Sequence, residues 1–335
     1  MDVAVTGGTG FIGANLVRRL LDRGDRVRCL IRKPRLALEG LDVALDTTPL
    51  DDSDAGVEAL ARSLDGCEGV YHVAGIFDPS PGGDARMRAV HVDATRALLR
   101  ACDRAGVKRL VLCSSSVTVG FGPRHAPGDE DTPLDPDRIY GRDNALRAYH
   151  DTKLEAEALA AGWPGPTEAV TVNPDFILGP WDVKPTSGQL IVAMAKRWVP
   201  VFPKGGKCFQ GAGDCAEGHV QAMLRGQPGR RYLLGNENLS YREFMRIVSD
   251  VTGRRPPVLP VPDLAVRLAG SAGRRLARLD AHRFAGLDPM VLRSMQQERY
   301  RTGARSWADL GVPRTPIHVA VERAHRWFRD HGYLR

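Results

Sequence analysis

The chain has little of what marks membrane, secreted or metal-binding proteins. No apolar run approaches the roughly 20 residues that are needed to cross a bilayer. The first strand begins at residue 2, which leaves no room for a signal peptide. The cysteines have neither metal-ligand nor redox spacing, so we expect reduced thiols that are buried or incidental. These absences predict a cytoplasmic protein with no membrane insertion and no metal. The cysteines are Cys29, Cys67, Cys102, Cys113, Cys208 and Cys215.

The positive charge of the chain is spread out. The net charge is +7, but there is no basic tail and no alternation of basic and aromatic residues, so a nucleic-acid partner is not expected. One dense arginine cluster fits a membrane-surface helix, although a solvated helix face is the commoner meaning of such a pattern. This cluster comprises Arg267, Arg274, Arg275, Arg278 and Arg283, with Leu268, Leu276, Leu279 and Phe284 among them.

The N-terminal stretch predicts a strand, a tight turn and a helix. An apolar run ends at Thr6, and a helical pattern resumes after Gly13. Between them, Gly8-x-Gly10-x-x-Gly13 overlaps Thr6-Gly7-x-x-Gly10-x-x-Gly13, and both are versions of the dinucleotide-binding fingerprint. Glycine lets a ligand touch bare backbone, and the free N–H groups of a first helical turn favour a pyrophosphate. The turn therefore predicts a dinucleotide site.

The second expected strand, 25–32, suggests which dinucleotide is bound. It ends in Arg32 and Lys33, with no acidic residue. In a nucleotide-binding sheet this position lies beside the adenosine ribose, where a carboxylate binds the 2′-hydroxyl of NAD and an arginine accommodates the 2′-phosphate of NADP. We therefore expect NADP (NADPH), with NAD as the less favoured cofactor. The other interpretation is that the two cations only make the strand end soluble.

Strands and helices alternate over the first half of the chain. This pattern predicts an α/β fold with a doubly wound parallel sheet of the Rossmann type, whose ligands bind at the carboxyl ends of the strands. We expect a nucleotide-binding domain from 1–178 plus about 207–235, and a smaller, mainly helical substrate lobe from 179–206 plus 236–335. The further expected strands are 43–50, 69–75, 107–113 and 169–174, and the expected helices include 55–64, 89–105 and 145–161.

Three polar residues carry the chemistry. Ser116 follows a strong strand, and Tyr149 and Lys153 share one face of the helix 145–161. A free tyrosine has a pKa near 10 and is a poor base near neutrality. The Lys153 ammonium and the positive nicotinamide would favour the phenolate and lower that pKa. Tyr149 could then exchange a proton with the substrate oxygen, and Ser116 would hydrogen-bond the carbonyl.

These residues amount to a family resemblance over the whole chain. It resembles the extended short-chain dehydrogenase/reductases, the NAD-dependent epimerase/dehydratase family. Within them it is similar to the dihydroflavonol-reductase-like branch and to proteins labelled hopanoid-associated sugar epimerases. The family motifs are Thr6-Gly-Gly-Thr-Gly-Phe-Ile-Gly13, His72-Val-Ala-Gly75, Ser114-Ser-Ser116, Tyr149-x-x-x-Lys153, Asn173-Pro174 and Gly179-Pro180. The closer likeness rests on Asp182-Val-Lys-Pro-Thr-Ser-Gly188, Ala216-Glu-Gly-His219, Gly229-Arg-Arg-Tyr-Leu-Leu-Gly235 and Trp327-Phe-Arg-Asp-His-Gly-Tyr333.

The resemblance implies a set of contacts with cofactor and substrate. The implied cofactor residues are Gly7, Thr9, Gly10, Phe11, Ile12, Gly13, Arg32, Lys33, Leu50, Val73, Ala74, Lys153, Pro174 and Ile177. The implied substrate contacts are Phe77, Ser116, Val117, Thr118, Tyr149 and Phe176. The expected partner is a small-molecule substrate. A homodimer through the helices 89–105 and 145–161 is also possible in this family.

The sequence departs from the family at three places. Thr48-Pro49-Leu50 lacks the acidic residue that relatives place beside the adenine. His91 stands where relatives carry an asparagine, and either a proton relay or a structural hydrogen bond is open to it. Gly211-Ala-Gly-Asp214 lacks a histidine and an aspartate that relatives have, which suggests an altered substrate side.

Three functions follow, in order. The first is an NADP(H)-dependent reductase or dehydrogenase that transfers a hydride between nicotinamide and a ketone, aldehyde or secondary alcohol. The second is a nucleotide-sugar epimerase or dehydratase with tightly held NAD(P). The dehydratase is the weaker form, because Val117-Thr118 stand where dehydratases carry an Asp-Glu pair. The third is a non-catalytic dinucleotide-binding protein.

Overall fold

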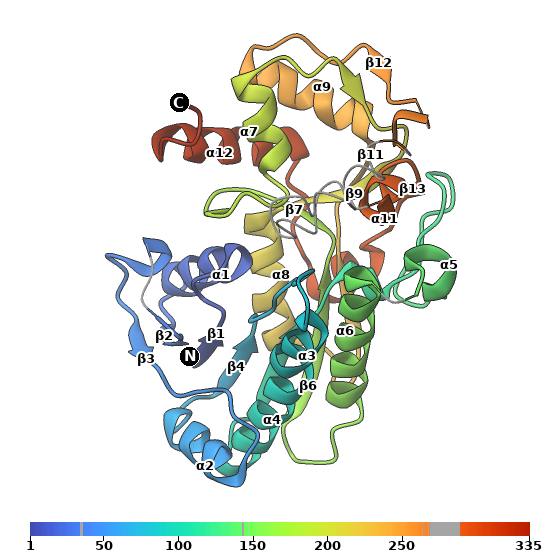
Figure 1. Ribbon diagram of the computed structural model, residues 1–335. Coiled ribbons are helices and arrows are strands. Elements are labelled where there is room, and N and C mark those ends of the chain that lie inside the picture. Colours follow the sequence, from blue (N-terminus) through green and yellow to red (C-terminus); the bar gives the residue numbers. More distant parts are fainter. Residues whose placement is uncertain (34–35, 143, 263, 267, 269–288) are drawn as a thin grey trace.

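The computed structural model describes residues 1–33, 36–142, 144–262, 264–266, 268 and 289–335 (Figure 1). The arginine cluster from Arg267 to Arg283 lies outside the described residues. Within them, no helix combines the length and the apolar character that a bilayer crossing requires. The same residues hold no group of three potential metal ligands. All six cysteines are buried free thiols, as expected.

A seven-stranded sheet forms the base of the molecule. Its strand order is β10-β6-β5-β4-β1-β2-β3, and every neighbouring pair is parallel. This is the predicted Rossmann arrangement, with the order reversing beside β1. The strands are β1 (Asp2–Thr6), β2 (Arg26–Leu30), β3 (Ala44–Asp46), β4 (Gly69–His72), β5 (Arg109–Cys113), β6 (Glu168–Pro174) and β10 (Arg231–Leu234).

Helices cover both faces of this sheet because its strands alternate between two apolar cores. Val3 and Val5 of β1 face one core with Leu16 of α1, and Ala4 faces the other with Leu98 of α4. The first face carries α1 (Phe11–Asp22) and α8 (Ala212–Arg225). The second carries α2 (Asp54–Ser63), α3 (Gly83–Arg88), η2 (Ala89–Asp93), α4 (Ala94–Ala105) and α6 (Ala145–Ala161). Short turns η1 (Leu36–Leu38) and η3 (Ser116–Thr118) and the helix α5 (Pro136–Tyr140) lie in the connections.

A second lobe lies above the sheet in Figure 1. It contains a four-stranded sheet of β7 (Phe176–Leu178), β9 (Gly206–Gly211), β11 (Glu237–Ser240) and β13 (Glu298–Arg299), and a small pair of β8 (Val201–Phe202) with β12 (Leu259–Pro260). Its helices are α7 (Gln189–Lys196), α9 (Tyr241–Thr252), α11 (Pro289–Ser294) and α12 (Ile317–Asp330), whereas the short η5 (Ser306–Leu310) packs against α8 and β10 of the large sheet. A separate apolar core holds Phe209, Phe244 and Phe328 between these elements.

Two expected elements are shorter or interrupted. The strand expected over 43–50 is confined to β3, an exposed edge strand that ends before Pro49. The helix expected over 89–105 begins with a π-helical turn, η2, which contains His91. The division into domains stays a proposal. Within its segment 207–235, β9 belongs to the second sheet, whereas α8 and β10 return to the large one.

Candidate active site

The glycine turn after β1 is packed from behind and open in front. Gly7 has a φ of +71°, and a Cβ there would lie 2.5 Å from the Ala74 nitrogen. A Cβ on Gly13 would lie 2.2 Å from the Gly7 oxygen. Gly10 is exposed, and a Cβ there would have only the Gly7 oxygen within 4 Å, at 3.2 Å. The turn thus offers bare backbone outward at Gly10, at the start of α1, where a pyrophosphate would fit.

We expect the Gly10→Ala variant to bind dinucleotide about tenfold more weakly without unfolding. The Gly10 backbone (φ −89°, ψ 175°) is open to alanine, but the methyl group would occupy the space of the ligand, at a cost of roughly 1–3 kcal/mol. Gly213→Ala is the matched control. It lies on exposed helical backbone, so it should leave affinity unchanged and stabilise the fold by about 0.5–1 kcal/mol. Fluorescence titration with NADPH measures the affinity of both variants. Equal affinity of the wild type and the two variants would contradict the site.

The cations after β2 are available to a ligand. Arg32 and Lys33 are both exposed, and neither forms an ion pair with any residue that the structure describes. They stand beyond the end of β2, the strand next to the glycine turn. A guanidinium there fits the 2′-phosphate of NADP.

The remaining cofactor positions border the same turn. Ala74 donates its N–H to the Thr6 hydroxyl at 3.2 Å, directly behind Gly7. Val73 and Ile177 pack into the core that also holds Phe11 and Ile12, whereas Leu50 lies against the opposite one. Thr9 is half-buried in the turn, and Pro174 is buried at the carboxyl end of β6. Their contacts with a cofactor stay predictions.

Tyr149 meets Ser115, the serine before the predicted Ser116. Ser115 continues the extended backbone of β5 (φ −159°, ψ 151°), and its side chain lies close enough to the Tyr149 phenol to lower the pKa of that group. Ser116 is buried and opens the turn η3. Its proposed contact with a carbonyl stays a prediction, but the hydroxyl beside Tyr149 belongs to Ser115. An extended strand end alternates its side chains, and three consecutive serines hide which one faces the helix.

Lys153 lies one turn after Tyr149 on α6, and its side chain is buried. Its Nζ donates to the Cys113 carbonyl at 2.9 Å, and the residue is 4% exposed. Burial lowers the pKa of Lys153 and raises the pKa of Tyr149 to about 12, although the nearby Ser115 side chain works against the rise at Tyr149. The expected acidification of Tyr149 included the nicotinamide charge, so it stays a prediction for the loaded enzyme.

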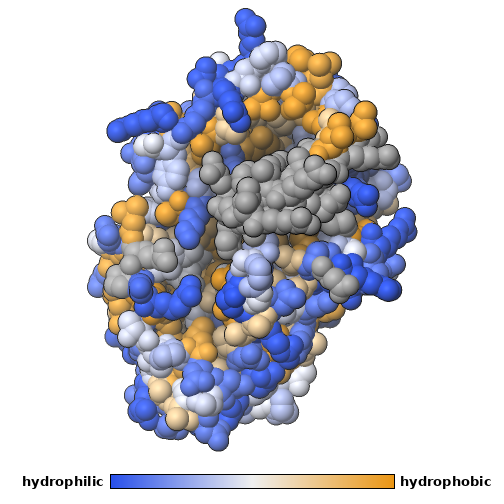
Figure 2. Space-filling view, in the orientation of Figure 1, coloured by the Kyte–Doolittle hydropathy of each residue, from blue (hydrophilic) through white to orange (hydrophobic). Residues whose placement is uncertain are grey.

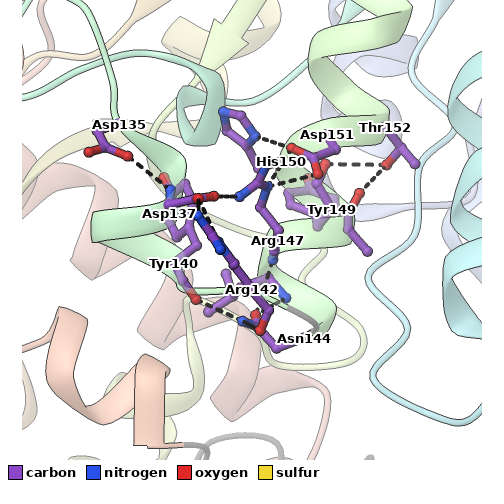
Figure 3. A network of polar contacts seen from close by, with 12 residues as sticks. Asp135, Asp137, Tyr140, Arg142, Asn144, Arg147, Tyr149, His150, Asp151 and Thr152 are labelled. Atoms are coloured by element: carbon purple, nitrogen blue, oxygen red, sulfur yellow. Dashed lines mark hydrogen bonds and ion pairs between the residues drawn. The ribbon is translucent and has the colours of Figure 1, made fainter.

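The start of α6 is held firmly, and this fixes the position of Tyr149 (Figure 3). The Asn144 side chain caps the helix by accepting the N–H groups of Leu146 and Arg147. Arg147 in turn pairs with Asp137 of α5 and with Asp151 one turn along. The ion pairs of Arg147 therefore hold the start of the helix that carries Tyr149.

His91 is locked as a neutral side chain. Its Nε2 accepts the Ile76 N–H at 3.2 Å, so its Nδ1 carries the proton and donates to the Thr152 hydroxyl at 2.9 Å. Burial lowers the pKa of His91 to about 3. The ring also contacts Tyr149 edge-on, with centroids 5.4 Å apart. Both ring nitrogens of His91 are therefore engaged in hydrogen bonds, and neither is free to relay a proton. This geometry fits a structural role for His91 at the position where relatives carry an asparagine.

The predicted substrate contacts are placed differently from one another. Phe77 is exposed and stands edge-on to Tyr149, with ring centroids 5.8 Å apart. Val117 is half-buried, and its carbonyl accepts the Tyr140 hydroxyl. Thr118 is buried, and its hydroxyl is bonded to Glu157. Phe176 packs on Phe209 in the second lobe. Of the two phenylalanines, Phe77 is the one that contacts the Tyr149 ring.

Two cations stand side by side in the second sheet. Lys207 of β9 and Arg299 of β13 are direct partners in a parallel pair, so their side chains share one face. Neither has an ion pair among the described residues. Arg299 is buried, its Nε has no partner, and its Nη2 donates to the Tyr140 hydroxyl at 3.0 Å. Burial lowers the pKa of Lys207 to about 8, and its Nζ lies 5.3 Å from the centre of the Phe176 ring. Sequence patterns gave no sign of this pair.

Comparison with known proteins decides the family. The model of the NAD dependent epimerase/dehydratase family matches residues 3–235. The chain belongs to this family. The family's name gives the cofactor class, a nicotinamide dinucleotide, and the resemblance predicted from the motifs is confirmed.

Similar proteins cover the whole chain. A "Putative dihydroflavonol 4-reductase" of Synechocystis sp. is 33% identical over 99% of this chain and 95% of its own. "Sterol demethylase protein B" of Methylococcus capsulatus is 32% identical over 100% of both chains. Among solved structures, gox2253 has a TM-score of 0.81 at 29% identity, covering 100% of this chain and 99% of that one. The likeness to dihydroflavonol reductases is confirmed, whereas the narrower hopanoid-associated label stays a prediction.

Proposed function

We propose that the protein is an NADP(H)-dependent oxidoreductase that interconverts a ketone or aldehyde and the corresponding alcohol of a small organic substrate. One observation carries the proposal: the Ser115 side chain lies by the phenol of Tyr149, and the buried ammonium of Lys153, one turn further along α6, donates to the Cys113 carbonyl at the end of β5. The names of the similar proteins, which include reductases, support the same class.

Each residue has a defined task in this proposal. When bound, the dinucleotide supplies or accepts the hydride. Tyr149 gives its proton to the carbonyl oxygen in reduction and takes it back in oxidation. A serine hydroxyl after β5, that of Ser115 or Ser116, donates to the oxygen on which negative charge develops. The charge of Lys153 favours the phenolate form of Tyr149. Phe77, exposed beside Tyr149, would cover one side of the reacting carbon.

The test begins with the purified protein. Any dinucleotide that it retains is identified by mass spectrometry, and NADPH oxidation is followed with ketones, aldehydes and nucleotide sugars. Because the similar proteins are named for dihydroflavonols and sterols, ketones of both kinds belong in the panel. We expect dissociable NADP(H) and turnover with a ketone or an aldehyde. Retained NAD together with epimerised sugar would overturn the proposal.

The choice of NADP has its own test in Arg32→Ser. Loss of a charge-assisted contact of about 1.5–3 kcal/mol predicts a 10- to 100-fold weaker affinity for NADPH. Affinity for NADH should stay within about twofold, because NADH has no 2′-phosphate. Arg62→Ser is the control, since Arg62 is also exposed but lies on α2, away from the turn. If the Arg32→Ser variant bound NADPH as tightly as the wild type, the NADP assignment would be wrong.

One observation favours a second candidate, a nucleotide-sugar epimerase. Like charges that face each other across strands are destabilising, and the Asp175 carboxylate, whose charge acts on both cations, is already paired with Arg301. Lys207 and Arg299 are therefore better explained if a ligand supplies further negative charge. A nucleotide diphosphate has that charge, as does a carboxylate on a reductase substrate. Lys207→Met tests for an anionic ligand in either case, since it should raise the KM of an anionic substrate at least tenfold. The class is then decided by which compound is turned over, a nucleotide sugar or a ketone that carries a carboxylate. The third function, non-catalytic dinucleotide binding, predicts affinity for NADPH with no turnover of any compound in the panel.

A further inference from the structure

A buried carboxyl group lies one helical turn beyond Lys153. Glu157 is 6% exposed, and its side chain receives donors from four elements of the large sheet and its connections. The donors are the hydroxyl of Ser114, the Thr118 Oγ1 at 2.6 Å, the Asn173 Nδ2 at 2.7 Å and the Arg231 Nη1 at 3.2 Å. A buried carboxylate with this many partners stabilises one arrangement of the groups around it.

The arrangement that Glu157 stabilises includes the turn at the end of β5. Asn173 Nδ2 also donates to the Ser115 carbonyl at 3.1 Å, and the Thr118 hydroxyl lies 3.0 Å from the same carbonyl. The Thr118 hydroxyl and the Asn173 amide are both also hydrogen-bonded to the Glu157 carboxyl group. Through them the carboxyl group fixes the backbone of Ser115, and thereby the distance of the Ser115 hydroxyl from Tyr149.

Glu157 also brings a negative charge to Lys153, which forms no ion pair with any residue that the structure describes. Among the groups that face Lys153, two histidines are held neutral, because burial lowers the pKa of each to about 3. Burial lowers the pKa of Lys153 as well, and the charge of Glu157 opposes this. The titratable groups around Lys153 are Tyr149 and Glu157 on α6, Cys113 on β5, His72 on β4 and His91 on η2.

We propose that Glu157 is a positioning residue of the active site, which holds the Ser115 turn against Tyr149 and supports the positive charge of Lys153. The inference rests on the proposed function. It adds a task for a residue that touches neither the expected cofactor nor the expected substrate.

The test is Glu157→Gln, which keeps an oxygen for the three donors that bond Oε1 and removes the charge that pairs with Arg231. We expect kcat for carbonyl reduction to fall about 10- to 100-fold, the effect of disturbing a buried polar group by 1–3 kcal/mol. The sign of the pH effect follows from the charge. Without Glu157, Lys153 loses its proton at a lower pH, so the alkaline limb of the pH–rate profile should move to lower pH. Glu155→Gln is the matched control: it lies on the same helix, exposed and paired with Arg88, and should stay within twofold.

Thr118→Val removes one link of the network and keeps the charge. It should lower kcat severalfold and leave the alkaline limb in place, which separates positioning from electrostatics. Amide exchange over residues 114–119 is measured on the same proteins and does not depend on turnover. Faster exchange in Glu157→Gln than in Glu155→Gln supports the inference. Unchanged exchange in Glu157→Gln overturns the inference, and this result can be obtained even if the proposed function fails and no substrate is found. With a substrate in hand, an unchanged kcat and an unchanged pH profile in Glu157→Gln overturn it as well.

Discussion

Tyr149→Phe should abolish most of the turnover and leave dinucleotide binding almost unchanged. A positioned general acid contributes about 10²- to 10⁴-fold to a rate, and phenylalanine removes only the hydroxyl. The ring keeps its edge-on contacts with Phe77 and His91, so the pocket should hold its shape. We expect kcat for carbonyl reduction to fall at least about 100-fold, while the Kd for NADPH stays within about twofold. Stopped-flow kinetics and fluorescence titration measure the two quantities.

The control for this variant is Tyr333→Phe. The Tyr333 hydroxyl also makes a hydrogen bond, to the Val183 carbonyl at 2.8 Å, but it belongs to the second lobe. This variant should keep the wild-type kcat. A Tyr149→Phe protein that retained more than a tenth of the activity would show that another group moves the proton. A wild type that binds NADPH and turns over nothing would point to the binding protein instead.

Arg301→Met should be the most destabilising of the substitutions considered. Arg301 is 2% exposed, and its Nη1 pairs with Asp175, 1% exposed, at 2.8 Å. Its Nε donates to the Gly120 carbonyl at 3.0 Å, and its Nη2 to the Val119 carbonyl at 2.8 Å. Methionine fills a similar volume but leaves a buried carboxylate unpaired, which costs about 3–5 kcal/mol. Urea unfolding should show that loss in the free energy of unfolding.

Arg124→Met is the comparison for this loss. Its ion pair with Glu243 is half exposed, with side-chain exposures of 48% and 45%. Exposed pairs contribute at most about 1 kcal/mol, so this variant should differ little from the wild type. If the two variants lost the same free energy, burial of the Asp175 pair would not be what stabilises the junction of the lobes.

Features with local spacing could be predicted from the sequence. The glycine turn after β1 and the pair of Tyr149 and Lys153 are set by distances of a few residues along one strand or helix, and the structure places them as the pattern requires. The parallel sheet followed from the alternation of strands and helices, because each strand buries residues on both faces. The family followed from the same short motifs.

Features that depend on register or on distant segments could not be predicted. Which of three consecutive serines meets Tyr149 depends on where β5 stops alternating and η3 begins. Glu157 has no unusual neighbour in the sequence, and its four partners come from positions up to 74 residues away. Lys207 and Arg299 become neighbours only because β9 and β13 pair. None of these relations leaves a pattern in one chain segment.

The path of the chain between its two sheets limits how this protein can diversify. After β6 the chain enters the four-stranded sheet with β7 and β9. It returns to the seven-stranded sheet with α8 and β10, and it enters the four-stranded sheet again with β11. A lobe interlaced in this way cannot be exchanged as a cassette between relatives, because each cut would remove a strand or a helix from the other half. New specificity must therefore arise in place, by single substitutions and by changes in loop length, while the common scaffold is inherited whole.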